Sequence, residues 1–586
     1  METNNPSTIK WIYNATKKYN GAVITVAVLS IATSCLSLYN ATLLKDIIDA
    51  ASNKDLYVFK RSGFTLLAVT IISIALELFS RYTREKTSYK LTNHLQRRFF
   101  SVLLNKDYYS VSKIHSQEWL NRVNQDSTTI ANAVTHVVPN LFGIAFHFIG
   151  AAYLIYTTSH TLIALVAIGA TLFVLLNYSL RNPLKQSQRE VRSSVGKKNI
   201  YLSEHLSKLM IVKAFNREDT TVYNSDEKFR DWMKRRMARL KLVIFKDGVQ
   251  STSTKLASFL ALVYCATRIL HGTMSYGSGV MLLKLLSQIR APLSAISQYI
   301  GNIFDVSVAA ERLMEPERYQ DDPSVSVLSD EEIFDMYENR FKEIAFTDAA
   351  FSYLDELEEN PNIEPTVFAH VDFTIPKKSS VAFTGITGSG KSTIFKLLMS
   401  LYPLQEGSKT IRYDDGSEVP LDASFRRLFA YVPQGNQLMA GTIREMITFG
   451  DIAEDDETAA QDISYNDDRI WGVLETACIK DFIESLPQQL DTVIGERGLG
   501  LSEGQLQRVA IARALYTKRP ILLLDEATSS LDEETERQLL QNIKKMTDHT
   551  TLIVTHRPAA LSICDYRIHI DGNRVTMHST HTANPD

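Results

Sequence analysis

The stretch Gly385-Ile-Thr-Gly-Ser-Gly-Lys-Ser-Thr393 decides the fold of the second half of this sequence. A β-prone run at 380–383 precedes it and a helical pattern at 394–401 follows, which is the context that a phosphate-binding loop requires. Glycines let backbone N–H groups close on phosphates, and the helix N-terminus favours anionic charge. Lys391 is expected to reach the outer phosphates and Ser392 to bind magnesium. The expected nucleotide ligands here are Gly385, Gly388, Ser389, Gly390, Lys391, Ser392 and Thr393.

A second apolar run, at 521–524, ends in the acidic pair Asp525-Glu526. A buried strand that delivers two carboxylates to a magnesium-nucleotide site divides the work between them. Asp525 is expected to hold the metal through water, and Glu526 to orient and polarise the attacking water. The alternative, an exposed acidic turn after a strand, is disfavoured by the phosphate-binding loop upstream.

Length and composition separate the two halves of the chain. The 586 residues suggest several domains, and the net charge of −3 gives no reason to expect nucleic acid as a partner. The long apolar runs all lie before about residue 310, whereas the second half is charged like an ordinary globular domain. The four cysteines, which have neither metal-ligand nor redox spacing, are Cys35, Cys265, Cys478 and Cys564.

The first half contains six apolar stretches long enough to cross a bilayer, which takes about 20 residues. The polar start at 1–20 and the long apolar run that follows, without a small-residue cleavage site, do not fit a secretory signal. The sequence therefore predicts a multi-pass membrane domain with spans at 21–43, 63–80, 137–157, 160–180, 250–272 and 276–306.

Two connections between these spans, 81–136 and 181–249, are long and rich in Lys and Arg. The positive-inside rule places both in the cytosol, together with the N-terminus and everything after the sixth span. Apolar residues recur at four-residue steps, as at Leu91, Leu95 and Phe99, which predicts membrane helices that continue into the cytosol as hairpins. Separate cytosolic subdomains are the alternative.

Several polar side chains interrupt the spans and should face a bundle interior or an aqueous cavity. Lys284 and Gln288 are four residues apart, on one face of the sixth helix. They fit a pathway for a polar or anionic solute, or instead a structural ion pair such as Glu77 with Lys284, or snorkelling near a helix end. The residues concerned are Glu77, His147, Arg268, Lys284, Gln288 and Arg290.

Further motifs in the second half resemble those of ATP-binding-cassette (ABC) transporters of the exporter type. Leu501-Ser-Glu-Gly-Gln505 resembles the family signature Leu-Ser-Gly-Gly-Gln, and 529–532 the loop after the catalytic carboxylate. The resemblance implies that Glu526, His556 and Gln434 serve catalysis, and that Gln434 joins Ser392 and Asp525 around Mg²⁺. Gly495-Glu-Arg-Gly498 resembles a short motif that exporters use to sense the membrane domain.

The resemblance covers nearly the whole chain and implies a multidomain fold. An all-α transmembrane domain of six helices with two long arms is expected at 1–320, and a linker at 321–340. An α/β P-loop ATPase domain with a helical subdomain, the ABC nucleotide-binding domain, is expected at 341–586. The segments 116–122 and 208–217 resemble the transverse coupling helices that would seat on the ATPase domains.

The signature segment has a physical reason to serve another chain. Ser502 is positioned to cap the helix that begins near Gly504, and Gln505 completes a capping-box pattern, which leaves exposed N–H groups as an anion site. In the family, this site closes on the γ-phosphate held by the opposite subunit. Ser502, Gly504 and Gln505 are therefore expected to bind ATP of a second half-transporter chain.

Tyr353 matches the aromatic residue that stacks on adenine in the family. A buried aromatic of a strand is the alternative. Glu503 departs from the family pattern, because a carboxylate replaces the usual glycine of the signature near a triphosphate. A homodimer that tolerates Glu503 is favoured, and a heterodimer whose partner carries the other signature is the alternative.

The sequence thus predicts an ATP-hydrolysing transporter subunit that works as a dimer by alternating access and exports an amphipathic solute such as a peptide, lipid or drug. An importer of a siderophore or other metal chelate on the same fold is the first alternative, because fold does not fix function. A third reading, an ATP-gated channel or regulator, is disfavoured by Glu526. The expected location is the bacterial plasma membrane, with the ATPase domain cytosolic.

Overall fold

The computed structural model describes residues 8–322, 328–353, 366–386, 388–435, 438–450, 466–495, 500–546, 548–571 and 574–580, apart from the side chains of 165, 170, 172–178, 181, 290–304 and 366. The chain divides into two compact units. The first, here the helical unit, comprises Met1–Val102 and Ser116–Glu317, and the second, the ATPase unit, comprises Leu103–His115 and Arg318–Asp586.

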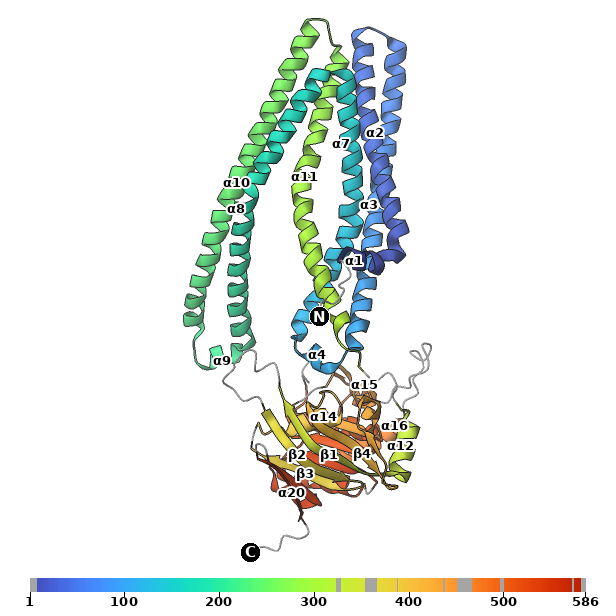
Figure 1. Ribbon diagram of the computed structural model, residues 1–586, viewed down its shortest axis with the longest axis vertical. Coiled ribbons are helices and arrows are strands. Elements are labelled where there is room, and N and C mark those ends of the chain that lie inside the picture. The colour runs from blue at the N-terminus through green and yellow to red at the C-terminus, as the bar shows by residue number, and fades with distance from the viewer. Residues whose placement is uncertain are drawn as a thin grey trace. The chain divides into compact units, whose positions relative to one another are not determined.

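The helical unit is built from long helices, visible as separate coils in Figure 1. Its helices, with two π-helical turns, are α1 (Thr8–Thr16), η1 (Lys17–Tyr19), α2 (Asn20–Ser52), α3 (Leu56–Leu104), α5 (Ser116–Asn121), η2 (Arg122–Asp126), α6 (Ser127–Asn132), η3 (Ala133–Val137), α7 (Val138–Thr158), α8 (His160–Ser207), α9 (Leu209–Ala214), α10 (Glu218–Leu270) and α11 (Tyr276–Met314). The short η4 (Glu315–Arg318) lies at the boundary of the two units.

Each of the six expected spans overlaps one long helix, except that residue 137 belongs to η3 and residues 271–272 follow the end of α10. Within the described residues, four helical stretches are long and apolar enough to cross a membrane, namely Thr8–Ser52, Leu56–Leu104, Ser116–Thr158 and Glu218–Leu270. The expected spans at 160–180 and 276–306 lie on α8 and α11, which include side chains outside the described set. Large apolar side chains on α3, such as Phe64, Leu67 and Ile71, are exposed as lipid contact requires.

Five helices of the helical unit meet in one apolar core. Leu38 of α2, Ile155 of α7, Leu162 of α8, Cys265 of α10 and Leu285 of α11 are buried there together. The antiparallel pair α8 and α10 also packs along the arms (Figure 1). Cys265 serves as a small apolar side chain, as its surroundings in the sequence indicate.

A carboxylate fixes the end of α2 against the start of α11. Asp49 accepts hydrogen bonds from Ser275 Oγ and from the Gly277 backbone N–H, each at 2.8 Å. A Cβ at Gly277 would lie 2.2 Å from the Lys45 carbonyl oxygen, so only glycine permits this approach. The contact holds α2 and α11 side by side, which matters for the cavity described below.

The segment Leu103–His115 belongs to the ATPase unit. Its helix α4 (Tyr108–Ser112) places Tyr108 and Tyr109 against Tyr402, with ring centroids 5.9 and 5.5 Å apart. Lys106 forms a 2.6 Å ion pair with Asp321 in the same unit.

The segment 116–122, expected as a coupling helix, belongs to the helical unit. Its residues form α5 and the start of η2 in the helical unit, where Arg122 pairs with Glu118 and Glu315. The aromatic side chains that contact the ATPase core lie just upstream, in α4. A short helix, α9, occupies the second expected segment.

The ATPase unit contains two main sheets. The first has the order β2-β1-β4-β5 and is antiparallel, and the second has the order β12-β11-β3-β10-β9-β6, in which the five strands from β11 to β6 run parallel. A two-stranded sheet pairs β7 with β8. The strands are β1 (Phe341–Ser352), β2 (Thr366–Pro376), β3 (Ser380–Gly385), β4 (Glu406–Tyr413), β5 (Glu418–Pro420), β6 (Phe429–Val432), β7 (Gly441–Thr442), β8 (Val493–Ile494), β9 (Ile521–Asp525), β10 (Thr550–Val554), β11 (Tyr566–Asp571) and β12 (Arg574–Ser579).

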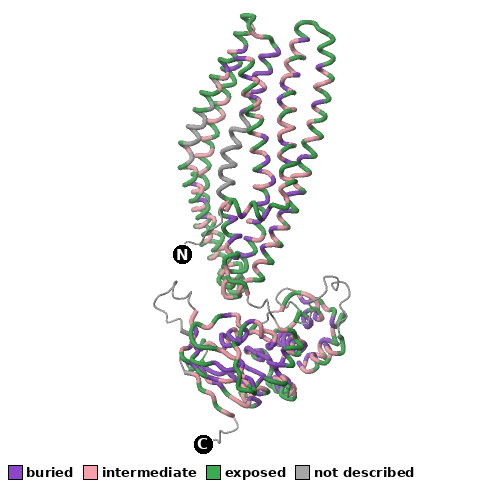
Figure 2. The backbone as a smooth tube through the Cα atoms, turned by 45° about the vertical axis from the view of Figure 1, so that its right-hand side comes forward, coloured by how far each residue is buried: buried purple, intermediate pink, exposed green. Residues whose placement is uncertain are grey.

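Helices cover both faces of the parallel sheet, and buried residues gather along it (Figure 2). One core lies against the antiparallel sheet and includes Phe383, Phe395 and Leu523, and the other packs the helical subdomain through Ile447, Leu474 and Val509. The helices are α12 (Asp330–Asn339), α14 (Lys391–Leu398), η6 (Ala423–Leu428), α15 (Ile443–Thr448), α16 (Asp467–Thr476), α17 (Lys480–Glu484), η8 (Gln489–Asp491), α18 (Glu503–Tyr516), α19 (Glu533–Lys544) and α20 (Pro558–Ile563).

Truncation of a buried side chain at the centre of the parallel sheet should destabilise the ATPase unit. Leu523 in β9 is fully buried, so Leu523→Ala is expected to cost about 2–5 kcal/mol through lost contacts and a residual cavity. Thermal unfolding of the purified chain should show a clearly lower midpoint. The control Val493→Ala removes an exposed side chain of β8 and should leave the midpoint near that of the wild type. Equal midpoints for the two variants would contradict this account of the core.

Candidate ATPase site and membrane cavity

The loop between β3 and α14 adopts backbone conformations that favour glycine. Gly388 and Gly390 have φ values of +88° and +87°, and a Cβ at Gly390 would lie 2.1 Å from Val367 Cγ1. The turn brings Lys391 under the loop, where its Nζ donates to the carbonyl oxygens of Gly385 at 3.0 Å and Ile386 at 2.8 Å. The local sequence thus forms a tight cradle that begins a helix.

Lys391 is buried within this cradle, at 5% exposure. Burial lowers the pKa of Lys391, an effect opposed by the nearby carboxylates Glu526 and Asp525. The buried Ser389 Oγ has no hydrogen-bond partner among the described residues. An orphaned hydroxyl in a glycine-rich turn beside a buried cation fits a phosphate group that completes its hydrogen bonds.

Asp525 is at the carboxyl end of β9, beside the loop. It is 1% exposed and accepts hydrogen bonds from Ser392 Oγ at 2.8 Å and Tyr431 OH at 3.3 Å. Burial raises the pKa of Asp525, and the two hydrogen bonds oppose that shift. A hydroxyl and a buried carboxylate side by side are oxygen ligands of the kind that Mg²⁺ prefers, so this pair fits the metal of a magnesium nucleotide.

Glu526 follows directly and is held in an unusual backbone conformation. Its φ is +49°, and its N–H donates to the Val554 carbonyl oxygen at 3.1 Å, which ties it to the end of β10. Its side chain accepts a hydrogen bond from Gln434 Nε2 at 2.7 Å. Gln434 follows β6, so the ends of two neighbouring strands bring the amide and the carboxylate together.

His556 follows β10 in the same row of strand ends and is exposed. The next residue, Arg557, forms a network that the sequence did not reveal. Its guanidinium donates to the carbonyl oxygens of Leu531 at 2.9 Å and Ser529 at 2.6 Å, and it pairs with Glu536 at 2.9 Å. Glu536 is only 1% exposed. Arg557 therefore fixes the loop after Glu526 to the strand end that carries His556.

The signature segment forms the predicted cap. Ser502 Oγ accepts from the Gln505 N–H at 3.3 Å, and Gln505 Oε1 accepts from the Ser502 N–H at 2.7 Å, which is a complete capping box at the start of α18. A Cβ at Gly504 would lie 2.9 Å from the Ser530 carbonyl oxygen. Gln507 also binds Ser529 Oγ at 3.1 Å, so α18 is fastened to the loop that Arg557 holds.

Glu503 is in the first turn of α18, and its side chain is exposed. A carboxylate there interacts favourably with the positive end of the helix. The charge of Glu503 is therefore unfavourable only toward a bound triphosphate. Because the side chain is exposed, solvent screens that repulsion.

Tyr353, which follows β1, is half-buried and contacts α14, the helix after the phosphate-binding loop. Its hydroxyl lies 3.0 Å from Thr393 Oγ1, and its ring meets Phe351 and Tyr402 edge-on. The aromatic cluster is consistent with both expected roles, adenine stacking and packing. In the motif at 495–498, residues 496–498 lie outside the described set.

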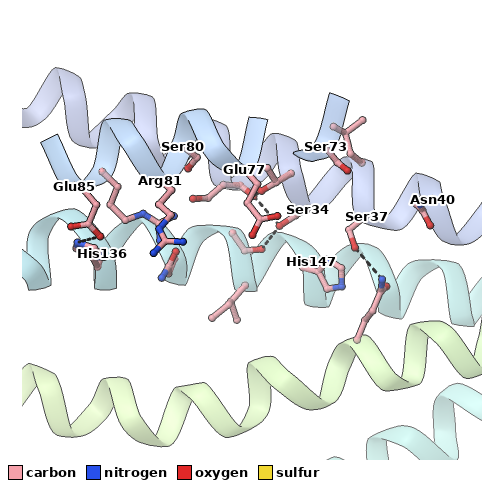
Figure 3. Close-up of a pocket in the computed structure, with 18 of the residues that line it drawn as sticks. Ser34, Ser37, Asn40, Ser73, Glu77, Ser80, Arg81, Glu85, His136 and His147 are labelled. Carbon is pink, nitrogen blue, oxygen red and sulfur yellow. Dashed lines mark hydrogen bonds and ion pairs between the residues drawn. The ribbon is translucent and has the colours of Figure 1, made fainter. Parts of the chain in front are cut away.

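A second candidate site is a cavity of about 790 Å³ in the helical unit (Figure 3). Glu77, His147, Lys284 and Gln288 all line it, whereas Arg268 does not. The side chain of Arg290 lies outside the described residues.

The alternative ion pair between Glu77 and Lys284 is not formed in the described part of the unit. Lys284 Nζ instead donates to Asn40 Oδ1. Sequence reasoning missed the remaining polar lining residues, although their spacing of three and four residues along α2 and α3 is a usable signal.

The two units match known family models. The model described as "ABC transporter transmembrane region" matches residues 23–293, and the one described as "ABC transporter" matches residues 368–529. A solved structure described as that of a bacterial Atm1-family ABC exporter with ATP bound matches with a TM-score of 0.75 at 21% identity, covering 96% of this chain and 95% of that one.

Two curated relatives resemble the chain at a similar level. It is 26% identical over 600 residues to a putative export ATP-binding/permease protein of Rickettsia conorii, covering 98% of this chain and 96% of the relative. It is 27% identical over 525 residues to ABC transporter B family member 1 of Dictyostelium discoideum, covering 89% of this chain and 55% of that relative, so it spans about half of that protein.

A phosphate-binding loop beside two strand-end carboxylates, in a chain with long apolar helices, defines a membrane protein with a P-loop ATPase. The chain belongs to the ABC transporters and has the exporter fold, with the membrane region and the ATPase in one polypeptide.

The Arg557–Glu536 pair offers a test of the site's framework. Arg557→Met should leave the buried carboxylate without its cation, at a cost of about 3–5 kcal/mol, and lower the unfolding midpoint. Adding Glu536→Gln to that variant should recover part of the loss, because no buried charge is then left unpaired. A double variant that is no more stable than Arg557→Met would contradict the network.

Proposed function

We propose that the chain is one half of a homodimeric ABC exporter that hydrolyses ATP to drive alternating access. The observation that carries the proposal is the convergence of Lys391, Asp525, Glu526 and Gln434 at the carboxyl ends of adjacent parallel strands. In this proposal residues 1–320 form the transmembrane domain, 321–340 the linker and 341–586 the nucleotide-binding domain.

In the proposed reaction, Glu526 polarises the water that attacks the γ-phosphate, and Gln434 orients that carboxylate through their 2.7 Å hydrogen bond. Lys391 and the loop amides hold the phosphates, and His556 contacts the γ-phosphate from the neighbouring strand end. Ser392, Asp525 and Gln434 would hold Mg²⁺, which would neutralise phosphate charge when bound. Tyr353 stacks on adenine.

A second chain completes the site in this proposal. Within the described residues, no hydrogen bond joins Ser502, Gly504 or Gln505 to the chain's own phosphate-binding loop, while the cap leaves helix N–H groups for an anion. ATP would then join the loop of one protomer to the signature of the other. We infer a homodimer because the catalytic residues are present together with an exposed Glu503.

The proposed membrane topology follows the charge of the arms. The Lys- and Arg-rich connections would lie in the cytosol with both ATPase domains, and the expected membrane is the bacterial plasma membrane. The name of the Rickettsia conorii relative supports export over the import of a metal chelate.

Replacement of Glu526 tests the chemistry. Glu526→Gln removes the group that polarises water, so the rate of Mg²⁺-dependent ATP hydrolysis in lipid nanodiscs should fall about 100-fold or more. Binding of a fluorescent ATP analogue should persist, because Lys391 and the loop are unchanged. A variant that hydrolyses ATP at the wild-type rate would refute the role of Glu526. A wild-type chain that binds ATP but does not hydrolyse it would refute the homodimer.

Replacement of Glu503 tests its tolerance in a homodimer. Because this side chain is exposed at the start of α18, Glu503→Gly should leave the hydrolysis rate of the same order as that of the wild type. Ser502→Ala, which removes a cap worth about 1 kcal/mol, is the comparison that should lower the rate. A large gain from Glu503→Gly would show instead that the carboxylate suppresses this site, as a heterodimer requires.

A further inference from the structure

Four helices of the helical unit turn polar stripes toward one cavity. Among the described residues, the polar lining side chains recur at helical spacing on α2, on α3, on η3 with α7, and on α11, and the apolar side chains that join them are those of Leu36 and Ile144. Figure 3 shows Ser34, Glu77, Arg81 and His147 along its length. The lining residues on α2 and α11, with Ser73, Glu77, Ser80 and His147, lie within the expected spans. Polar groups are costly there, so this part of the lining indicates a site for a hydrophilic solute.

The lining carries more positive than negative charge. Among its described residues the cations are Arg81, Arg84 and Lys284, and the carboxylates are Glu77 and Glu85, with the histidines counted as neutral. Among the described side chains, no carboxylate oxygen lies within 4.0 Å of a nitrogen of any of the three cations. Glu85 faces His136 at 4.0 Å instead. The cations are therefore available to an anionic ligand.

Two further atoms lack partners at this lining. Arg84 Nε and Gln288 Oε1 are buried and have no hydrogen-bond partner within the described residues. Gln288 Nε2 donates to Ser37 Oγ at 3.0 Å, which orients the amide beside Lys284 on the same face of α11. A ligand whose anionic group pairs with Lys284, and whose adjoining N–H donates to Gln288 Oε1, would give both Lys284 and Gln288 a partner.

The charges are separated along the cavity. Figure 3 shows Arg81, Glu85 and His136 toward one end of the cavity and Asn40 toward the other. Arg84 is next to Glu85 in the sequence, and Lys284 on α11 donates a hydrogen bond to Asn40. The stripe on α3 from Ser73 to Glu85 corresponds to about 18 Å of helix. The cavity is therefore long and has a cationic group near each end.

An apolar cargo does not fit this lining. Pockets for drug-like ligands are mostly apolar with a few polar groups, and this cavity has the opposite composition within the same range of volumes. A lipid chain or hydrophobic drug would strip water from the two carboxylates and three cations without replacing their hydrogen bonds, which is unfavourable.

We propose that this cavity binds a small, elongated, hydrophilic solute with a carboxylate near each end, such as a short acidic peptide. One carboxylate would pair with Arg81 and Arg84 and the other with Lys284. Amide N–H groups between them would donate to Gln288 Oε1 and to the hydroxyl row of α2. The inference narrows the cargo of the proposed exporter and rests on that function for its transport step, but the binding step stands by itself.

The test is direct binding to the full chain in nanodiscs without nucleotide. The probe is acetyl-Glu-Gly-Gly-Glu-amide, measured by titration calorimetry beside the neutral Gln-Gly-Gly-Gln and cationic Lys-Gly-Gly-Lys analogues with the same blocked ends. We expect the acidic peptide to bind at least about tenfold more tightly than either analogue, because charge-assisted hydrogen bonds are stronger than neutral ones. Comparable affinity for the three peptides would overturn the proposal, and so would tighter binding of a hydrophobic dye.

Substitutions locate the binding. Arg81→Gln and Lys284→Gln should each weaken the acidic peptide about tenfold or more, and Lys284→Arg should retain most of the affinity. Arg268→Gln, which removes a cation of α10 outside the cavity, is the matched control and should change neither affinity nor ATP hydrolysis. Equal losses in Arg268→Gln and Lys284→Gln would overturn the assignment to this cavity.

Failure of the proposed ATP-driven transport can be distinguished from failure of the cargo assignment. If Glu526→Gln binds the peptide normally while the wild type shows no ATP hydrolysis, the cargo assignment stands and the proposed ATPase role fails. If hydrolysis is normal and depends on Glu526, but the acidic peptide does not bind, the cargo assignment fails alone. Inorganic phosphate that binds as tightly as the peptide would also overturn the cargo assignment. A single small anion cannot contact the cations at both ends of the cavity, so two separated carboxylates would then not be needed for binding.

Discussion

The parallel alignment of β6, β9, β10 and β3 is the constraint on which the ATPase unit depends. Parallel strands end at the same edge, so residues that are far apart in the chain meet there: Gln434, Asp525, His556 and the loop that carries Lys391. Burial of Lys391 and Asp525 at that edge is tolerated because opposite charges and hydrogen bonds surround each of them.

The same edge is connected to the signature helix by polar contacts. Gln507 on α18 binds the loop after Glu526, and Arg557 binds that loop from the end of β10. The left-handed backbone of Glu526 starts the loop. A displacement at this edge would therefore reach the surface that we propose for the second protomer, and in the proposed dimer it would link hydrolysis to opening.

The helical unit has the reverse arrangement of polar and apolar side chains, because its surroundings are expected to be lipid. Large apolar side chains face outward on α3, while serines, amides and charges gather inward around the cavity between α2, α3, α7 and α11. The hydrogen bonds of Asp49 to the start of α11 hold two of these walls together. The cavity is thus a product of helix packing rather than of any one segment.

The sequence by itself determined the features with local signals: the phosphate-binding loop, the Ser502 cap, the carboxylates at the end of β9 and the helices of the spans, because each depends on neighbours within a few residues. Only the tertiary structure decided that Arg557 pairs with buried Glu536, that α4 rather than 116–122 joins the ATPase unit, and that Lys284 binds Asn40 instead of Glu77. Those outcomes depend on which helices and strands pack together, and residues distant in the sequence carry no local sign of their partners.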